Sequence, residues 1–444
     1  MAGECKTRRV QFTTDEIAAA VRGEVVGEST SIDGASIDSR SVGEGELFVP
    51  LVAERDGHDF VPAAVEAGAA AYLTAREPVA GAATAIRVDQ TMDAFTRLGS
   101  VARDRLPEAV IGITGSVGKT SVKDLLASVL ATTFRTAASE KSFNNEIGVP
   151  LTLVNAPADT EVLVQEMGAR GVRHIRQLCD VARPSAAIVT MVAEVHTSEF
   201  AGLDEVALGK GELVEAVPVD GFVVLNGSDA RVRKMAERTD ARVITYGVSG
   251  DVVAQKVGVD GELRPKFRLS SPWGSVDVQL AVHGVHQVGN ALAASAAGLA
   301  QGVPIEAIPD GLREASLSPW RMELRQARAG GAVINDAYNS NPTALEAAMH
   351  SLAAIDADRH VAVLGLMAEL GEHSEQRHAE MGDLAHELGI ELITVSCPLY
   401  GTGIDVPTID AAIDAVGTVG PGVAVLVKAS RSAGLETLAD ALTH

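Results

Sequence analysis

One segment decides the fold of this 444-residue chain: Ile111-Gly112-Ile113-Thr114-Gly115-Ser116-Val117-Gly118-Lys119-Thr120. An apolar run, residues 109–113, precedes the glycine-rich part. Apolar residues follow it at helical spacing, at Val122, Leu125, Leu126, Val129 and Leu130. The pattern predicts a strand, a glycine loop and a helix, so backbone N–H groups and the positive end of the helix dipole meet at the loop. Such a turn favours the binding of phosphate groups.

The loop also carries side chains typical of nucleoside triphosphate sites. Lys119 can reach the β- and γ-phosphates, and the Thr120 hydroxyl can bind Mg²⁺. The common pattern G-x-x-x-x-G-K-[ST] would place its first glycine at position 113, where this chain has Ile113. A glycine-rich turn with an exposed lysine is the alternative, but strand, loop and helix follow one another in register. We therefore expect the chain to bind a nucleoside triphosphate.

Apolar, β-branched runs alternate with helical segments along most of the chain. Because these runs are apolar throughout, they predict parallel strands covered on both faces, in an α/β protein. Segments between 254 and 280 alternate in polarity instead and predict a hairpin inserted in or appended to the central domain. The predicted strands are 161–165, 186–192, 221–225, 242–246, 332–334, 360–364, 391–395 and 423–427.

Two breaks predict three domains. A charged, proline-containing link at 103–108 precedes the strand of the glycine loop, and a turn-rich segment at 316–321 precedes a fresh pattern of strands and helices. We expect domains over residues 1–106, 107–317 and 318–444.

Composition excludes several classes of function. The formal net charge of −22 argues against binding of nucleic acid or anionic membranes. No apolar stretch approaches the roughly 20 residues that span a bilayer, and the basic N-terminus lacks the apolar run of a secretory signal. The three cysteines have no paired spacing, which argues against a disulfide framework or a zinc site. We expect a cytoplasmic protein without membrane insertion.

Candidate metal ligands follow two predicted strands. Glu166 comes after 161–165 and His196 after 186–192, so both are expected at the carboxyl edge of the sheet, where such sheets bind ligands. An exposed loop acid and a structural histidine are the alternatives. Lys210 lies in a predicted helix over 203–214, where a solvated helix face is the alternative.

Polar segments follow two later strands. The sequence Asn335-Asp336-Ala337-Tyr338-Asn339-Ser340-Asn341-Pro342 suits recognition of ribose, base and amide groups, although Asx residues at strand ends also make turns and caps. The segment Lys428-Ala429-Ser430-Arg431 is an anion clamp or a charged loop.

The order of these motifs resembles that of the Mur ligases, and most closely the MurF type, over essentially the whole chain. Residues 37–49 and 56–60 resemble the family's UDP-binding module, and 114–120 its P-loop. Residues 141–150 and 336–342 resemble MurF signatures, and the Asp-Asn-Pro-Arg motif of diaminopimelate-adding MurE enzymes is absent from the sequence. Departures from the family pattern are Gln287 for Asn, Trp320 for Gly, Ala193 for a frequent Gly and Leu366 for a common Asp.

The resemblance implies a fold, a reaction and a set of site residues. The N-terminal domain would bind the UDP-sugar, and the central domain would hold ATP on a P-loop sheet. The C-terminal domain would be a Rossmann-like unit. The enzyme would be a monomer that joins D-Ala-D-Ala to UDP-MurNAc-tripeptide through an acyl phosphate, using ATP and two Mg²⁺ ions. Lys119, Lys210 and His196 would be catalytic. Thr120, Glu166, His196 and a carbamylated Lys210 would bind metal. ATP would contact Thr114, Gly115, Ser116, Gly118, Lys119, Thr120, Asn290, Arg321, Asp336 and Tyr338. The other substrates would contact Ser39, Arg40, Asn144, Asn145, Asn339, Asn341, Lys428, Ser430 and Arg431.

Other functions are compatible with many of these residues. A MurE-like ligase, or a Mur-type ligase with an acceptor outside peptidoglycan, would keep every ATP-binding residue. A non-catalytic ATP-binding homologue would keep the fold without the reaction, and a nucleotidase or kinase would cleave ATP without an amine. Release of ADP that depends on the amine separates a ligase from the last two.

Overall fold

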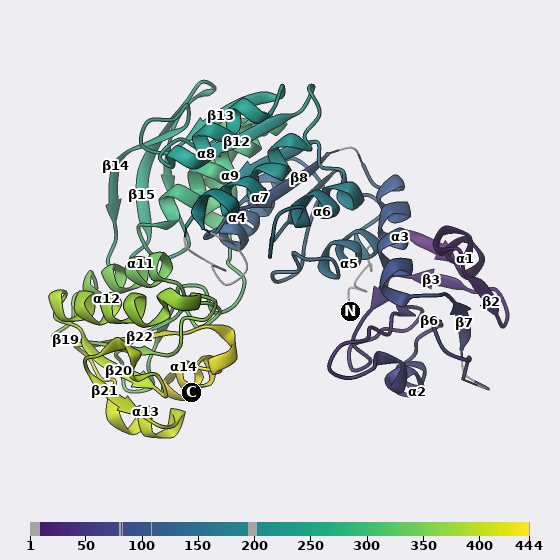
Figure 1. The fold of residues 1–444 in the computed structure, drawn as a ribbon. Coiled ribbons are helices and arrows are strands. Elements are labelled where there is room, and N and C mark those ends of the chain that lie inside the picture. The colour runs from purple at the N-terminus through teal and green to yellow at the C-terminus, as the bar shows by residue number, and fades with distance from the viewer. Residues whose placement is uncertain (1–8, 80, 82, 108, 194–201, 444) are drawn as a thin grey trace, which may run out of the picture.

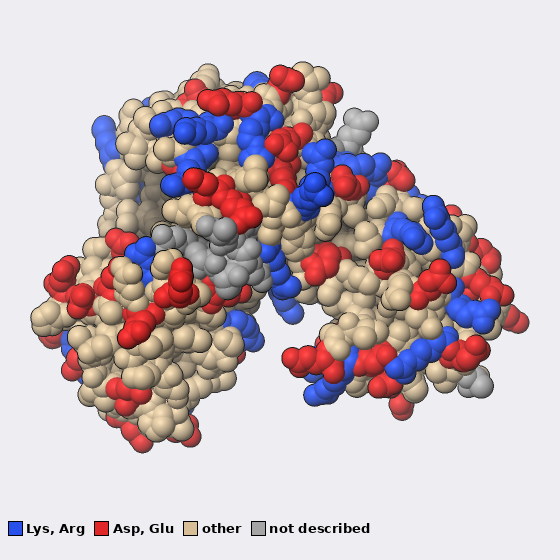
Figure 2. Space-filling model, in the orientation of Figure 1, with Lys and Arg blue, Asp and Glu red and all other residues tan. Residues whose placement is uncertain are grey.

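The computed structural model describes residues 9–79, 81, 83–107, 109–193 and 202–443. Their elements gather around three larger sheets, and Figure 1 shows the central sheet between the N-terminal sheet on the right and the C-terminal sheet at lower left. No helix in these ranges is long and apolar enough to cross a membrane. On the face drawn in Figure 2, acidic and basic side chains are interspersed.

The central sheet has six parallel strands in the order β13-β12-β11-β8-β10-β9. Helices α4 (Lys119–Ala131) and α9 (Gln287–Gln301) pack on one face, and α5 (Gly148–Asn155), α6 (His174–Ala182) and α7 (Leu203–Glu215) on the other. The predicted strand–loop–helix is confirmed, with β8 in the interior of the sheet. The strands are β8 (Val110–Thr114), β9 (Thr136–Ala138), β10 (Val162–Glu166), β11 (Ala186–Val189), β12 (Phe222–Asn226) and β13 (Arg242–Tyr246).

Strand β11 ends three residues earlier than the predicted 186–192. Beyond it, the Thr190 hydroxyl donates to the carbonyl of Val117 at 2.6 Å, and the carbonyl of Met191 accepts from the N–H of Ser116 at 2.8 Å. The chain after β11 therefore binds the glycine loop instead of continuing the ladder.

A three-stranded antiparallel sheet, β14-β15-β16, joins the central part, so the predicted hairpin is confirmed and gains one strand. Leu263, between its first two strands, is 3% exposed and packs into the C-terminal core. The strands are β14 (Val253–Val259), β15 (Pro265–Ser271) and β16 (Gly274–Gln279).

The C-terminal sheet has the order β17-β18-β22-β19-β20-β21, parallel except for β17. Its helices are α11 (Pro342–Ala353), α12 (Ser374–Glu387), α13 (Ile409–Val416) and α14 (Glu436–Thr443). The strands are β17 (Glu323–Gln326), β18 (Ala332–Asn335), β19 (Arg359–Leu364), β20 (Glu391–Val395), β21 (Ile404–Val406) and β22 (Val423–Lys428). Because β18 and β22 are neighbours, segment 336–342 and Lys428 leave the sheet at the same edge.

The N-terminal sheet has the order β2-β7-β6-β5-β4, and helix α3 (Thr91–Asp104) links it to the central part. Leu98 of α3 and Leu153 of α5 are both fully buried in one apolar core that runs through both parts. The strands are β2 (Glu24–Val26), β4 (Ala35–Ser36), β5 (Leu47–Phe48), β6 (Ala71–Thr74) and β7 (Thr84–Arg87), with β1 (Gln11–Thr13) and β3 (Ser31–Asp33) as a separate pair.

Candidate active site

The glycine loop is held tightly against its surroundings. Gly115 has φ 146°, and a Cβ there would lie 1.8 Å from the Thr190 hydroxyl. Gly118 has φ 88° and precedes the first turn of α4, and a Cβ there would lie 2.6 Å from Oδ1 of Asn290. Both positions need glycine because of the positive φ and the close approach. The Lys119 ammonium folds back onto the carbonyl of Gly115 at 2.7 Å.

Polar side chains from the central and C-terminal parts of the molecule converge beside this loop. The Thr120 hydroxyl donates to Oε2 of Glu166 at 2.8 Å and accepts from the guanidinium of Arg321 at 2.8 Å. The other oxygen of Glu166 accepts from the amide of Asn144 at 2.8 Å. Glu166 is the last residue of β10 and is 1% exposed. The two hydrogen bonds from the Thr120 hydroxyl and the Asn144 amide orient its carboxylate.

The segment after β18 forms the opposite wall. Lys428, 2% exposed, donates to Oδ2 of Asp336 at 2.5 Å and to the carbonyl of Asn339 at 2.7 Å. The hydroxyl of Tyr338 is hydrogen-bonded to that of Ser142 in the central part, and the Arg321 guanidinium stacks on the Tyr338 ring, 4.2 Å from its centre. The buried Lys428 ammonium thus holds Asp336 and Asn339, which line the pocket, in place.

These groups line one pocket of about 450 Å³ between the central and C-terminal parts. Two buried polar atoms on its lining, Nε of Arg321 and Nδ1 of His286, have no hydrogen-bond partner among the described residues. Unpaired buried donors and acceptors are rare, so they fit a polar ligand. The predicted residues on the lining are Ser116, Gly118, Lys119, Thr120, Asn144, Glu166, Asn290, Arg321, Asp336, Tyr338, Asn339, Asn341 and Lys428.

Other predicted residues make local contacts outside the lining. Oδ1 of Asn145 accepts from the N–H of Gly148 at 2.9 Å at the start of α5, and the Ser430 hydroxyl accepts from the N–H of Ala368 at 2.8 Å. Arg431 stacks on Trp320, 4.3 Å from the ring centre. Thr114 is fully buried at the end of β8. Asn341, although on the lining, caps α11 by accepting from the N–H of Ala344 at 2.9 Å.

Ser39 and Arg40 lie in a separate loop of the N-terminal part, after β4. Arg40 is exposed and pairs with Asp38 at 2.7 Å. The hydrogen bonds from Arg40 lower the pKa of Asp38 to about 2, and the charge of Lys141 contributes a smaller part.

Burial lowers the pKa values of two lysines, Lys119 and Lys210. Lys210 lies on α7 and is 2% exposed. Burial lowers its pKa well below the ordinary value, and the nearby Lys119 ammonium lowers it further. Burial also lowers the pKa of Lys119, against the opposing charge of Glu166. His196 lies outside the described residues.

The donor set suits a hard cation shared with a ligand. Among the described residues no group of three or more His, Cys, Asp or Glu side chains could hold a metal by itself. Glu166 and the Thr120 hydroxyl offer oxygen donors 2.8 Å apart at the start of α4. Mg²⁺ commonly takes one or two carboxylates together with substrate phosphates, so these residues fit it.

Sequence reasoning missed some of the lining. Thr190, Asn226 and Tyr246 follow or end the strands β11, β12 and β13, and the carbonyl of Thr190 accepts from both other side chains, at 2.8 and 3.1 Å. The signal available was their place at the ends of predicted parallel strands. Ser142 lies in segment 141–150, which resembles a family signature, but its hydrogen-bond partner Tyr338 is 196 residues away in the sequence.

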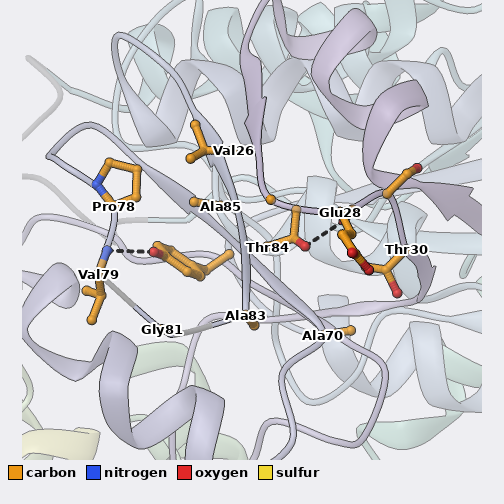
Figure 3. A pocket seen from close by; sticks show the side chains of 13 residues that line it. Val26, Glu28, Thr30, Ala70, Pro78, Val79, Gly81, Ala83, Thr84 and Ala85 are labelled. Atoms are coloured by element: carbon orange, nitrogen blue, oxygen red, sulfur yellow. Dashed lines mark hydrogen bonds between the residues drawn. The ribbon is translucent and has the colours of Figure 1, made fainter.

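A second hollow, of about 770 Å³, lies in the N-terminal part and is drawn in Figure 3. Two hydroxyl groups on its lining are already hydrogen-bonded: the Tyr72 hydroxyl accepts from the N–H of Val79, and the Thr84 hydroxyl donates to the carbonyl of Glu28. Much of its lining is Gly, Ala and Val, and no predicted site residue borders it. Its size therefore does not make it the better candidate.

Comparison with known proteins assigns the family. Sequence profiles of the Mur ligase family match three stretches: the catalytic domain profile at residues 31–106, the middle domain at 113–298 and the glutamate ligase domain at 320–431. The chain is 37% identical to UDP-N-acetylmuramoyl-tripeptide–D-alanyl-D-alanine ligase of Mycobacterium tuberculosis, over 98% of both chains. This chain belongs to the Mur ligase family.

Solved Mur ligases have the same fold. A crystal structure of MurF from Acinetobacter baumannii superposes with a TM-score of 0.88 at 29% identity, over 98% of this chain and 99% of that one. MurF from Thermotoga maritima, solved in complex with ADP, gives 0.79 at 25% identity, over 92% and 96%. The resemblance to Mur ligases of the MurF type, with an α/β three-domain architecture, is therefore confirmed.

Proposed function

We propose that this chain is the ATP-dependent, ADP-forming ligase that joins D-Ala-D-Ala to UDP-MurNAc-tripeptide in peptidoglycan precursor synthesis. The observation that carries the proposal is the single pocket in which Lys119, Thr120 and Glu166 meet Arg321 and Tyr338. The likeness to MurF enzymes over nearly the whole chain supports the choice of substrates. We further propose a cytoplasmic monomer with domains over 1–106, 107–317 and 318–444.

The reaction has two steps. A peptide carboxylate of UDP-MurNAc-tripeptide attacks the γ-phosphorus of ATP, so a C–O–P bond forms and ADP leaves. The amine of D-Ala-D-Ala then attacks the acyl carbon, the C–N bond forms, phosphate leaves with the C–O pair, and the amine loses a proton. Both reactants of the first step are anionic, so cationic and dipolar groups must stabilise the charge that they bring together.

The positions of several of the chain's own residues support this proposal. The phosphates would lie against the N-terminus of α4, where Lys119 exchanges its contact with the carbonyl of Gly115 for phosphate oxygens. Arg321, between Tyr338 and Thr120, would bind ATP from the C-terminal side, with Asp336 held by Lys428 and Asn290 near the loop. Thr114, Gly115, Ser116 and Gly118 would shape the phosphate cradle.

Mg²⁺, when bound, would neutralise phosphate charge and polarise the γ-phosphoryl group. Thr120 and Glu166 would hold it, and a carbamylated Lys210 together with His196 would hold a second ion. Burial of Lys210 next to Lys119 favours the neutral amine that carbamate formation needs. A carbamate would place an anion where the structure gathers cations.

The remaining substrates would use the other wall and the N-terminal loop. Ser39 and Arg40 would contact the UDP-sugar, and Asn144 and Asn145 the segment that joins it to the peptide. Asn339, Asn341, Lys428, Ser430 and Arg431 would bind or shape the site for the peptide and D-Ala-D-Ala. Lys428 and Asn341 would shape the site without contacting substrate. The Lys428 ammonium is bonded to Asp336, and the Asn341 side chain caps α11.

One assay tests the proposal. ADP release is followed with ATP, Mg²⁺ and UDP-MurNAc-tripeptide, with and without D-Ala-D-Ala. We expect turnover only when both substrates are present. Equal turnover without the dipeptide, or with a free amino acid in its place, would reject the assignment.

A further inference from the structure

A long-range hydrogen bond ties α4 to the connection between the central and C-terminal sheets. Oδ2 of Asp124 accepts from the N–H of Ser318 at 2.6 Å, across 194 residues of sequence. The other oxygen of Asp124 lies 3.0 Å from the ammonium of Lys123, whose side chain is 3% exposed. That ammonium also donates to the carbonyls of Ser139 and Lys141, at 2.8 and 2.6 Å. The Asp124 carboxylate is thus fixed on one side and holds the connection with the other.

The connection, residues 315–322, runs from α10 (Ile308–Glu314) to β17. Trp320 and Met322 have φ of 61° and 51°, the left-handed region that L-residues avoid, and they flank Arg321. Such a backbone persists only where surrounding contacts impose it. The direction of the Arg321 side chain therefore depends on what anchors this connection.

Anchors lie on both sides of Arg321. Towards the C-terminal part, the N–H of Tyr338 donates to the carbonyl of Trp320 at 3.2 Å, and the N–H of Met322 to Oδ1 of Asp336 at 3.1 Å. Towards the central part, the backbone is held at Ser318 by Asp124. These contacts therefore hold the backbone of the connection on both sides of Arg321.

The geometry of α4 makes the central anchor specific. Thr120 and Asp124 are four residues apart, so they lie one turn apart on the same face of this helix. Arg321 and Ser318 are three residues apart on the connection. The hydrogen bonds Thr120–Arg321 and Asp124–Ser318 therefore run side by side, the first between two residues of the pocket lining and the second outside the lining.

We propose that Asp124 is a positioning residue, which pins the interdomain connection to α4 and thereby holds the Arg321 guanidinium against Thr120 at the nucleotide site. Asp124 does not line the pocket, so we expect it to act on the ligand only through Arg321. The proposal rests on the proposed nucleotide-binding role of this pocket. Its test uses ADP binding, which does not require the ligase reaction.

The test compares three single variants by calorimetric titration with ADP and Mg²⁺. Asp124→Ala removes the acceptor for the N–H of Ser318 and is expected to raise the Kd for ADP about tenfold. Asp124→Asn keeps an oxygen acceptor and is expected to bind within about twofold of the wild type. The matched control is Ser128→Ala, which removes a 2.7 Å hydrogen bond from the same helix to the carbonyl of Gly311. It leaves the Kd unchanged.

A double variant separates positioning from simple destabilisation. If Asp124 acts through Arg321, adding Asp124→Ala to Arg321→Ala raises the Kd by less than about twofold. A wild-type Kd for Asp124→Ala, or a full tenfold loss on the Arg321→Ala background, overturns the proposal. A wild type that binds ADP but does not ligate rejects the proposed reaction and leaves this test standing. A wild type without ADP affinity overturns both.

Discussion

The two junctions of the central part differ in chemistry. The junction with the N-terminal part is an apolar core, in which Leu98 of α3 is fully buried. At the junction with the C-terminal part, polar contacts surround the pocket: Thr120 with Arg321, Ser142 with Tyr338 and Asp124 with Ser318. Apolar burial is non-directional and serves stability, whereas hydrogen-bonding groups oriented across a cleft are preorganised for charged ligands. The chemistry is therefore expected at the polar junction, and changes at the two junctions should differ in kind.

The largest effect is expected at Lys119. Lys119→Ala removes the cation that would face the phosphates. The activation free energy should rise by about 3 kcal/mol or more, which is measured as a lower kcat. Lys119 is the first residue of α4 and its side chain is half-buried outside the apolar core, so circular dichroism should show an unchanged fold. Near-normal kcat in the folded variant would remove the glycine loop from the mechanism.

Lys210→Ala should be nearly inactive because the proposed carbamate, and with it a ligand for the second metal ion, is lost. A short carboxylic acid added in solution is expected to restore part of the turnover, since it can supply the missing anion. The solvated helix face that the sequence left open is excluded, because Lys210 is 2% exposed. A buried lysine with a purely structural role would lose stability in this variant and leave kcat intact in the folded enzyme. Full activity of this variant would support that simpler role.

Leu98→Ala tests the apolar junction. The cavity left in a fully buried core should lower the free energy of unfolding by about 2 kcal/mol or more, measured by urea titration. We expect the KM for ATP to stay unchanged, because Leu98 does not line the pocket. A raised KM for ATP with normal stability would break the distinction between the two junctions.

Arg40→Ala should act on one substrate alone. The exposed guanidinium is proposed to contact the UDP-sugar, so its loss is expected to raise the KM for UDP-MurNAc-tripeptide about tenfold. The KM for ATP is the internal control and should not change. Equal shifts in both constants would indicate a role outside the N-terminal loop.

The smallest effect concerns pH. Burial lowers the pKa of His286 below its ordinary value, so the folded state keeps this imidazole neutral. As the pH falls below about 6.5, the unfolded chain binds the proton more readily, and folding loses stability. His286→Gln should therefore show a melting temperature that falls less between pH 7.5 and pH 5.5 than that of the wild type, by about 1–2 °C. Identical pH profiles would show that His286 is not held neutral.

Local pattern was sufficient to predict much of the fold. The glycine loop, the parallel strands and the hairpin near 254–280 follow from the spacing of apolar residues, and the structure contains all of them. The prediction was wrong at the end of β11, because the backbone after Val189 bonds to the glycine loop, a contact between segments about 75 residues apart. Strand boundaries depend on such tertiary contacts, which periodicity does not record.

By itself the sequence determined which elements form, which motifs they carry and which family the motifs resemble, because spacing and composition are local properties. Only the tertiary structure decided which motifs meet. It brought Tyr338 to Ser142 and Arg321 to Thr120, and it turned Lys428 towards Asp336 instead of the open pocket. It also paired Asp124 with Ser318. These contacts join residues that are 92 to 201 positions apart, so they depend on how separate sheets pack and not on any local pattern.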